Sequence, residues 1–224
     1  MVGPCCELVN MSKRICVFLL ALVALCQVAR AQVSLRTNLL WDAVSEPNLG
    51  IELALGEHWS VGVDGGLKAW PRWLAWDWES QENTTHWRNF AVVPELRYYL
   101  KEVYDGLYFG ADLLYTHFNV GNVQFPFGLY PQVRDARLQG DLLGAGLLAG
   151  RSYWLGRHWR VEAQLGVAVG YYYAGKYSCD HCSSQEGVAE GPAVVPKLGV
   201  NIGWNPRARQ KKEEVMEIIN NNNQ

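Results

Sequence analysis

The sequence predicts an all-β fold, an eight-stranded antiparallel up-and-down transmembrane β-barrel with an N-terminal signal peptide. The first observation is residues 158–173 (HWRVEAQLGVAVGYYY), where every second residue is apolar, with aromatic residues at both ends, and the others are polar or small. Successive side chains of a strand point to opposite faces, so one face of this strand suits lipid and the other a polar interior. The second observation is ten Trp and eleven Tyr in a chain whose mean hydropathy is slightly negative. Alternating strands, rather than apolar helices, are typical of such a composition.

The one continuous apolar run, residues 15–29, has the features of a secretory signal. It follows Lys13 and Arg14 and ends in the small-x-small tripeptide Ala-Arg-Ala. We therefore expect residues 1–31 to be a signal peptide that is cleaved after Ala31. This divides the chain into the leader, a barrel over residues 32–205 and a charged, Asn-rich periplasmic tail over residues 206–224.

Two alternatives at the N-terminus stay open. Met11 could be the true start, since the residues before it add nothing that a leader needs. Lipidation at Cys26 is the other, although Leu25 directly before it is larger than lipoprotein processing favours.

Each predicted strand places apolar residues at every second position, and together the strands repeat the pattern of residues 158–173. Trp41 ends the outward face of the first strand, and Pro94 in the fourth predicts a bulge because it lacks an N–H donor. In the sixth strand the run LLGAGLLAG hides the two faces, and a change of phase near Leu143 is expected. The strands are residues 32–42, 48–56, 59–68, 89–100, 107–116, 135–154, 158–173 and 193–204.

The predicted connections alternate in length. Those after the second, fourth and sixth strands are short, whereas residues 71–87, 119–134 and 174–191 form long loops. Outer-membrane barrels place short turns in the periplasm and long loops outside, so both termini should be periplasmic. We expect the bacterial outer membrane as the location, with four tryptophans on the periplasmic rim: Trp59, Trp154, Trp159 and Trp204. A soluble lipocalin-type barrel has the inverse pattern and is disfavoured.

The inward face carries six acidic and six basic residues, which predicts a salt-bridged interior without an open pore. An eight-stranded barrel is only wide enough for side chains to fill, so opposite charges should pair. A proton or ion path is the alternative. The predicted interior charge network comprises Arg36, Glu52, Asp64, Lys68, Glu95, Arg97, Asp112, Arg137, Asp141, Arg160, Glu162 and Lys197.

Cys179 and Cys182 are the only cysteines left after leader cleavage, and they lie in the third long loop. A secreted chain favours a disulfide between them. A metal site that includes His181 and a thioredoxin-type redox role remain the alternatives, but this short stretch offers three ligands where a structural zinc takes four. No metal or cofactor is expected.

The first long loop is rich in tryptophan, and two interpretations of it stay open. The rings could belong to the outer aromatic belt, or they could stack on sugars or enter lipid headgroups. The candidate binding residues are Trp73, Trp76, Trp78 and Trp87.

A catalytic site is not supported by the sequence, because no Ser-His-Asp set can be recognised by its spacing and His117 falls on the outward phase. The polar residues considered for an enzyme of the outer rim are His86, His117, Ser152, Asp180, His181 and Glu186. The net charge of −2 gives no reason to expect nucleic acid as a partner.

Thr-Asn-Leu-Leu-Trp-Asp-Ala at residues 37–43 and Pro-Asn-Leu-Gly-Ile-Glu at residues 47–52 resemble a family of small Bacteroidetes-type outer-membrane proteins. The resemblance extends over residues 33–205 and implies an eight-stranded barrel of uncharacterised function, with some members beside fimbrial genes. It carries no catalytic residues. We therefore expect a structural or surface-interaction role, associated with adhesion or fimbriae, with outer-membrane lipid and an extracellular glycan or fimbrial protein as partners. An enzyme that modifies lipid A or phospholipid is the alternative, and a small nonselective pore the third.

Overall fold

The computed structural model describes residues 32–68, 86–124, 130–134, 136–178 and 184–206. The predicted all-β fold with eight antiparallel strands is confirmed, and within these described residues helix is confined to two short elements, α2 (Leu39–Ala43) and η2 (Pro131–Val133). The strands are β1 (Val33–Asn38), β2 (Asn48–Ala54), β3 (Trp59–Lys68), β4 (His86–Tyr99), β5 (Gly106–Gly121), β6 (Arg137–Trp154), β7 (Trp159–Tyr177) and β8 (Gly187–Trp204).

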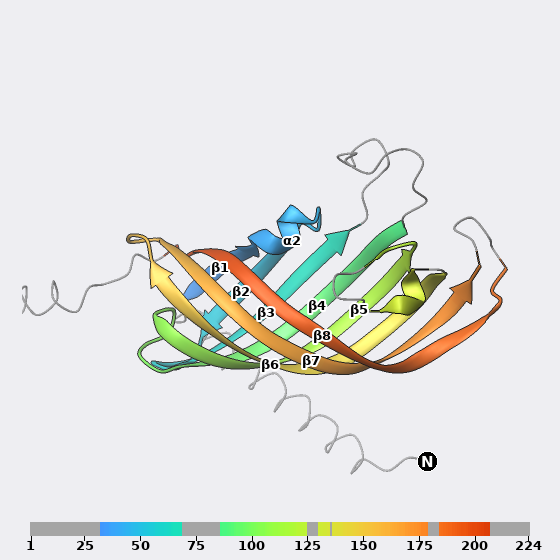
Figure 1. The fold of residues 1–224 in the computed structure, drawn as a ribbon. Coiled ribbons are helices and arrows are strands. Elements are labelled where there is room, and N and C mark those ends of the chain that lie inside the picture. The colour runs from blue at the N-terminus through green and yellow to red at the C-terminus, as the bar shows by residue number, and fades with distance from the viewer. Residues whose placement is uncertain (1–31, 69–85, 125–129, 135, 179–183, 207–224) are drawn as a thin grey trace, which may run out of the picture.

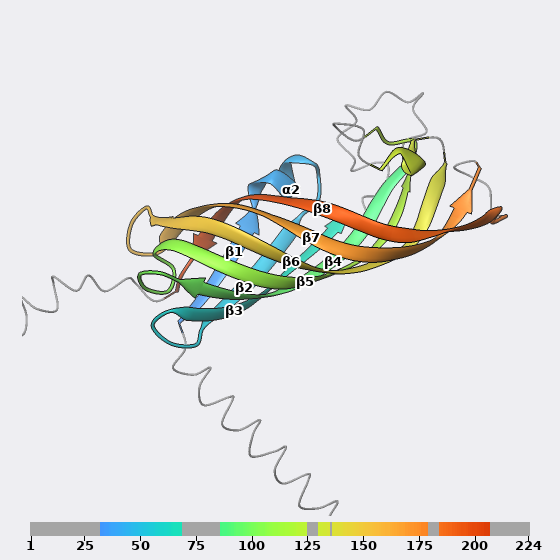
Figure 2. The same cartoon turned by 60° about the horizontal axis from the view of Figure 1, so that its bottom comes forward.

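The eight strands form one closed, ring-like sheet (Figure 1). Each strand pairs with the next in sequence, and β8 pairs back with β1 through Leu35↔Trp204 and three further residue pairs. The ring is uneven, since β1 has 6 residues and β7 has 19. The long strands β6, β7 and β8 extend well beyond β1 and β2 on one side (Figure 2).

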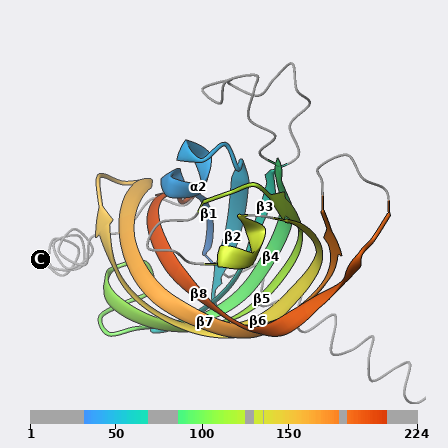
Figure 3. The same cartoon turned by 45° about the vertical axis from the view of Figure 1, so that its right-hand side comes forward.

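The two rims of the ring differ in their connections, as the sequence predicts. The termini-side rim carries Gln32, Asn205 and the short turns at residues 55–58, 100–105 and 155–158. The loop-side rim carries α2, η2 and the connections after β3, β5 and β7. Seen toward the loop-side rim, α2 and η2 lie across the mouth of the ring (Figure 3).

The outward face of the ring is apolar and the inward face of its termini-side half is charged. Leu147 on β6 and Leu165 on β7 leave 69% and 65% of their surface exposed, whereas Arg160 and Glu162 on β7 are fully buried. Apolar side chains also occupy outward positions of other strands, among them Ile51, Val63, Leu96, Leu113 and Leu198. The burial pattern is therefore inverted relative to a globular core.

Two predicted strand features are wrong. The register of β4 with β5 continues unchanged on both sides of Pro94, so no bulge forms there. The registers of β6 with β5 and with β7 are also continuous along the whole strand, so no change of phase occurs near Leu143. Because the phase is fixed by Ser152 and Leu148 pointing inward, Asp141 and Arg137 point outward.

The first predicted strand is too long, because β1 ends at Asn38 and the chain turns into α2. Asn38 caps α2 by accepting a hydrogen bond from Leu40 N at 3.0 Å. Trp41 therefore leaves the predicted outward face and packs against the buried cluster around Val93 and Leu114.

Two turns of the termini-side rim share the sequence Leu-Gly-x-His-Trp and the same hydrogen bonds. In each, the leucine N–H donates to the tryptophan carbonyl, Leu55 to Trp59 at 2.8 Å and Leu155 to Trp159 at 2.9 Å. The histidine ring then contacts the carbonyl of a neighbouring strand end, at 3.0 Å for His58 and 2.8 Å for His158. The repeat gives the two hairpins the same anchor.

Among the described residues, no helix has the length and apolar character needed to cross a membrane.

Candidate functional site

Glu52 is the centre of a buried charge network in the termini-side half of the ring. It is fully buried and belongs to β2, yet its carboxylate reaches side chains of four other strands. Its partners are Nη1 of Arg36 at 3.0 Å, Nη1 of Arg97 at 3.4 Å, Nη2 of Arg160 at 2.7 Å, Oγ of Ser60 at 2.5 Å and Oη of Tyr99 at 2.9 Å. Such a density of charged hydrogen bonds compensates for the desolvation of a buried carboxylate.

Three arginines and four carboxylates make up the whole network. The charges sum to three positive against four negative, with the excess carboxylate, Asp64, at the more exposed edge. Arg36 holds Asp64 with two parallel bonds, from Nε at 2.8 Å and from Nη2 at 2.6 Å. The remaining pairs are Arg36–Glu95, Arg97–Glu95, Arg97–Glu162 and Arg160–Glu162. The network links β1, β2, β3, β4 and β7 across the inside of the ring.

Three buried tyrosines close the ring below the network, at the termini-side rim. Tyr99 packs against Tyr108 with ring centres 5.0 Å apart, and the guanidinium groups of Arg97 and Arg160 lie 4.5 Å over Tyr108 and Tyr104. Tyr104 belongs to the turn after β4 and has a left-handed backbone, with φ of 71°. Its hydroxyl donates to Gln32 O at 2.7 Å, and burial raises the pKa of Tyr104 well above its usual range, so it stays a neutral donor.

A separate ion pair lies on the other side of the interior. Lys197 Nζ on β8 is 2.6 Å from Asp112 Oδ2 on β5. A Cβ added at Gly146 would lie 2.9 Å from Asp112 Oδ1, so the glycine leaves room for this carboxylate.

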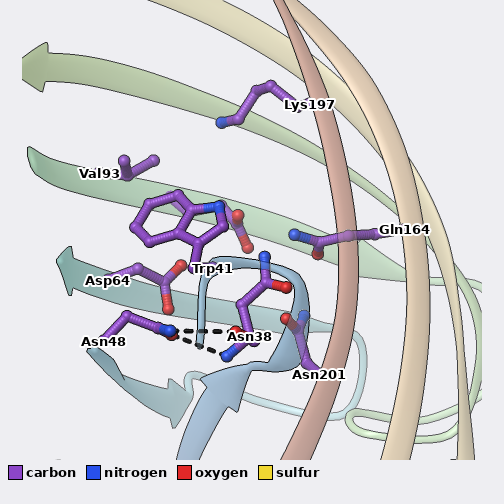
Figure 4. A pocket seen from close by; sticks show the side chains of 9 residues that line it. Asn38, Trp41, Asn48, Asp64, Val93, Gln164, Lys197 and Asn201 are labelled. Atoms are coloured by element: carbon purple, nitrogen blue, oxygen red, sulfur yellow. Dashed lines mark hydrogen bonds between the residues drawn. The ribbon is translucent and has the colours of Figure 1, made fainter. Parts of the chain in front are cut away.

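A small cavity lies between the charge network and α2 (Figure 4). Its volume is about 30 Å³, which holds a few water molecules, whereas ligand pockets typically start at about 300 Å³. Trp41 covers it from the loop side, and Lys197, Gln164 and Asn201 point into it. The cavity suits water that hydrates these polar groups.

Trp41 is held in place by the residues that carry the family resemblance. Asn48 Oδ1 accepts from Asn38 N at 2.7 Å, while Asn48 Nδ2 donates to Asn38 O and to Asp42 Oδ1, both at 3.0 Å. A Cβ added at Gly66 would lie 2.7 Å from Cζ3 of Trp41, so only glycine leaves space for the indole there.

The loop-side half of the interior contains two apolar clusters, unlike the termini-side half. Val93, Leu114 and Leu142 form a buried cluster against which Trp41 and Tyr130 pack. A second cluster around η2 contains Val120, Val133, Leu138 and Ala174. Tyr130, the residue directly before η2, donates from Oη to Val194 O at 2.6 Å. Together with α2, this packing fills the mouth of the ring in the described part of the chain.

Of the twelve predicted interior charges, ten lie on the inward phase of their strands. Lys68 is among them, near the loop-side rim, where its ammonium is 3.9 Å over the Trp87 ring. The prediction is wrong for Asp141 and Arg137. The Asp141 side chain is 53% exposed on the outside, beside His117 and Tyr115, and Arg137 stacks 4.5 Å over Tyr177. Charged side chains occur on the outward face there because this end of β6 lies past the apolar belt, the band of exposed apolar outward residues that includes Leu143 and Leu147 on β6 and Leu165 on β7.

Other residues also lie elsewhere than the sequence predicts. Trp87 belongs to β4, not to a loop, and packs half-buried inside the ring against the cluster around Val133. Trp154 is at the predicted rim but on the inward phase, where it packs against the tyrosine cluster. Ser152 is buried and donates to Tyr104 O at 2.9 Å. The predicted residues outside the described part of the chain are Trp73, Trp76, Trp78, Cys179, Asp180, His181 and Cys182, together with the leader and the tail.

The sequence prediction missed Tyr99, Tyr104 and the short helix α2. The alternation that places Glu95 and Arg97 inward also predicts Tyr99 inward, so this signal was present. For Tyr104, which enters the interior from a turn, alternation gives no signal.

In the comparison with protein families, the model described as a protein of unknown function (DUF3575) matches residues 15–205. No curated protein matches the chain.

Proposed function

We propose that this chain, which belongs to the DUF3575 family, is an outer-membrane β-barrel with a structural or surface-interaction role. The barrel spans the membrane with its eight strands, keeps both termini in the periplasm and presents the loop-side rim outside the cell. The partners are outer-membrane lipid around the strands and a fimbrial protein or extracellular glycan at the loop-side rim.

The inverted burial pattern is the observation that carries this proposal. Leucine and valine side chains cover the outward face, while arginine and glutamate fill the inside. In water such a surface would aggregate, whereas in a bilayer it buries its apolar side chains in lipid. A closed sheet also leaves no unpaired strand edge in the hydrocarbon core.

The filled interior supports a structural role over a pore. Among the described residues, the tyrosines fill one end of the interior and Trp41 and Tyr130 pack at the other, and the cavity beside the charge network measures about 30 Å³. Ions would have to displace paired charges to pass.

The loop-side rim supports a role in surface interactions. Leu39 and Leu40 on α2, and Val44 directly after it, leave 39–41% of their surface exposed. Exposed apolar side chains on a short, hydrogen-bonded helix give a preformed contact surface.

Gel mobility and cell fractionation test the proposal. A closed barrel resists detergent until it is heated, so the protein should migrate differently in boiled and unboiled samples and should sediment with outer membranes. Equal mobility together with a soluble fraction would contradict it. Loss of co-purifying surface protein or glycan on replacing Leu39 and Leu40 with serine, with no change in heat shift, would support the interaction surface.

A further inference from the structure

His117, Asp141 and Tyr115 form a hydrogen-bonded group on the outside of the ring, apart from the interior network. Asp141 Oδ1 lies 2.9 Å from His117 Nδ1 and accepts a hydrogen bond from Tyr115 Oη at 2.8 Å. His117 is 49% exposed and Asp141 53%. The two residues pair directly in the register of β5 and β6, so two rigid strands fix their separation.

The position of this group along the strands is its second feature. Toward the termini-side rim, the outward neighbours on β6 are Leu143 and Leu147, which belong to the apolar belt. Toward the loop-side rim, the next outward register positions carry Arg88, Asn119 and Gln139. In the proposed membrane orientation, the group therefore sits where acyl chains end and polar headgroups begin, the depth at which lipid acyl esters lie.

We infer that this outward group is a site for hydrolysis of acyl esters of membrane lipids. The inference rests on the proposed membrane location of the outward face and adds an activity to it. With Asp141 at Nδ1, the Nε2 atom of His117 is the ring nitrogen left to act as a base toward water. The carboxylate fixes the tautomer and steadies the imidazolium that forms, and the Tyr115 hydroxyl holds the carboxylate.

The reaction needs only water as co-reactant. A water oxygen attacks the ester carbonyl carbon while His117 Nε2 takes the water proton. The C–O bond to the alcohol then breaks, and the same proton passes from Nε2 to the departing alkoxide. The products are a free fatty acid and a lipid with one acyl chain fewer.

Arg88 and Asn119 supply the donors that this reaction requires for negative charge. Asn119 lies two residues from His117 along β5, about 7 Å away, and Arg88 faces Asn119 from β4, on the diagonal from His117. An exposed guanidinium at this distance suits a headgroup phosphate or the developing oxyanion. His117 is the catalytic base, and Asp141 and Tyr115 are positioning residues.

The full-length protein, purified in detergent, tests the site with two substrates of the same ester chemistry. Phosphatidylethanolamine and lipid A are presented separately in mixed micelles in H₂¹⁸O, and released fatty acids are measured by mass spectrometry. Wild type should release fatty acid with one ¹⁸O atom from at least one lipid, and the lipid that reacts identifies the source. His117→Asn should lower the rate roughly 10²–10⁴-fold.

Variants of Asp141 separate a positioning role from a structural one. Asp141→Asn should lower kcat with little change in KM, and Asp141→Glu should recover part of kcat. Lys101→Gln, which breaks an exposed ion pair on the opposite rim, should match wild type.

Two results would overturn the inference. One is a protein that shows the heat-dependent shift in gel mobility yet releases no fatty acid from either lipid, which leaves the barrel proposal intact. The other is release that persists in His117→Asn. A protein without the heat-dependent shift would contradict the barrel proposal instead, whatever the lipid assay gives.

Discussion

Arg160 on β7 donates from Nη2 to Oε2 of Glu52 on β2 at 2.7 Å, across the inside of the ring. The two residues are 108 positions apart and both side chains are fully buried. The contact joins two strands that are not neighbours in the sheet. The charge network thus acts as a brace between opposite walls, which sheet hydrogen bonds alone cannot provide.

Removing the central carboxylate should therefore be costly. Glu52→Ala leaves three buried guanidinium groups without a shared partner and should lower the free energy of unfolding by about 3–5 kcal/mol. Urea titration of the protein refolded into phospholipid vesicles measures this. Lys101→Ala, at an exposed ion pair, should cost about 1 kcal/mol or less. If both variants cost the same, the network does not brace the ring.

Trp41 should stabilise the closed loop-side mouth. Trp41→Ala removes apolar surface that packs on Val93 and Leu114 and should lower the free energy of unfolding by about 1.5–3 kcal/mol. Leu40→Ala is the matched control, because Leu40 lies on the same helix but is exposed, and it should cost less than about 1 kcal/mol. The same urea titration compares them. An equal loss in both variants would mean that the indole does not pack into the ring.

Glu46, in the connection between α2 and β2, should make stability depend on pH. Burial raises the pKa of Glu46, and neither the hydrogen bond from Asn89 nor the charge of Lys68 offsets this. The folded state then binds the proton more tightly than the unfolded state, so stability falls as pH rises from the ordinary glutamate pKa through the raised one. Glu46→Gln removes this fall.

Unfolding midpoints at about pH 4 and about pH 7 measure the effect. Glu46→Gln should be closer to wild type at the lower pH and more stable than wild type at the higher one. A variant that is less stable than wild type at the higher pH would show that the ionised carboxylate is favourable where it stands.

The outward faces of most strands could be predicted because apolar residues occupy every second position over a whole strand. The faces of β6 were harder to predict. Its inward residues Leu138 and Leu142 are apolar because they pack in the two loop-side clusters, while its outward Asp141 lies past the apolar belt. A rule that places charge inside fails where the outside is also polar. Both Leu-Gly-x-His-Trp turns were predicted from the sequence, but that they repeat one sequence was not noticed.

The short helix α2 could not be predicted from the alternation of residues in this stretch. Leu39 and Trp41 continue the alternation of β1, so the sequence alone favours a longer strand. What ends the strand is the set of hydrogen bonds from Asn48, ten residues beyond Asn38, together with the space left at Gly66. Such contacts exist only once β2 and β3 have paired.

The most direct test of the membrane-spanning account compares two arginine substitutions on the outward face of β6. Leu147, 69% exposed, lies in the middle of the apolar belt, and Gln139 lies about 26 Å further along the strand, past the belt. In phospholipid vesicles, Leu147→Arg should lower the free energy of unfolding by about 2–4 kcal/mol and Gln139→Arg by about 1 kcal/mol or less. Equal costs for the two substitutions would contradict a lipid-facing belt.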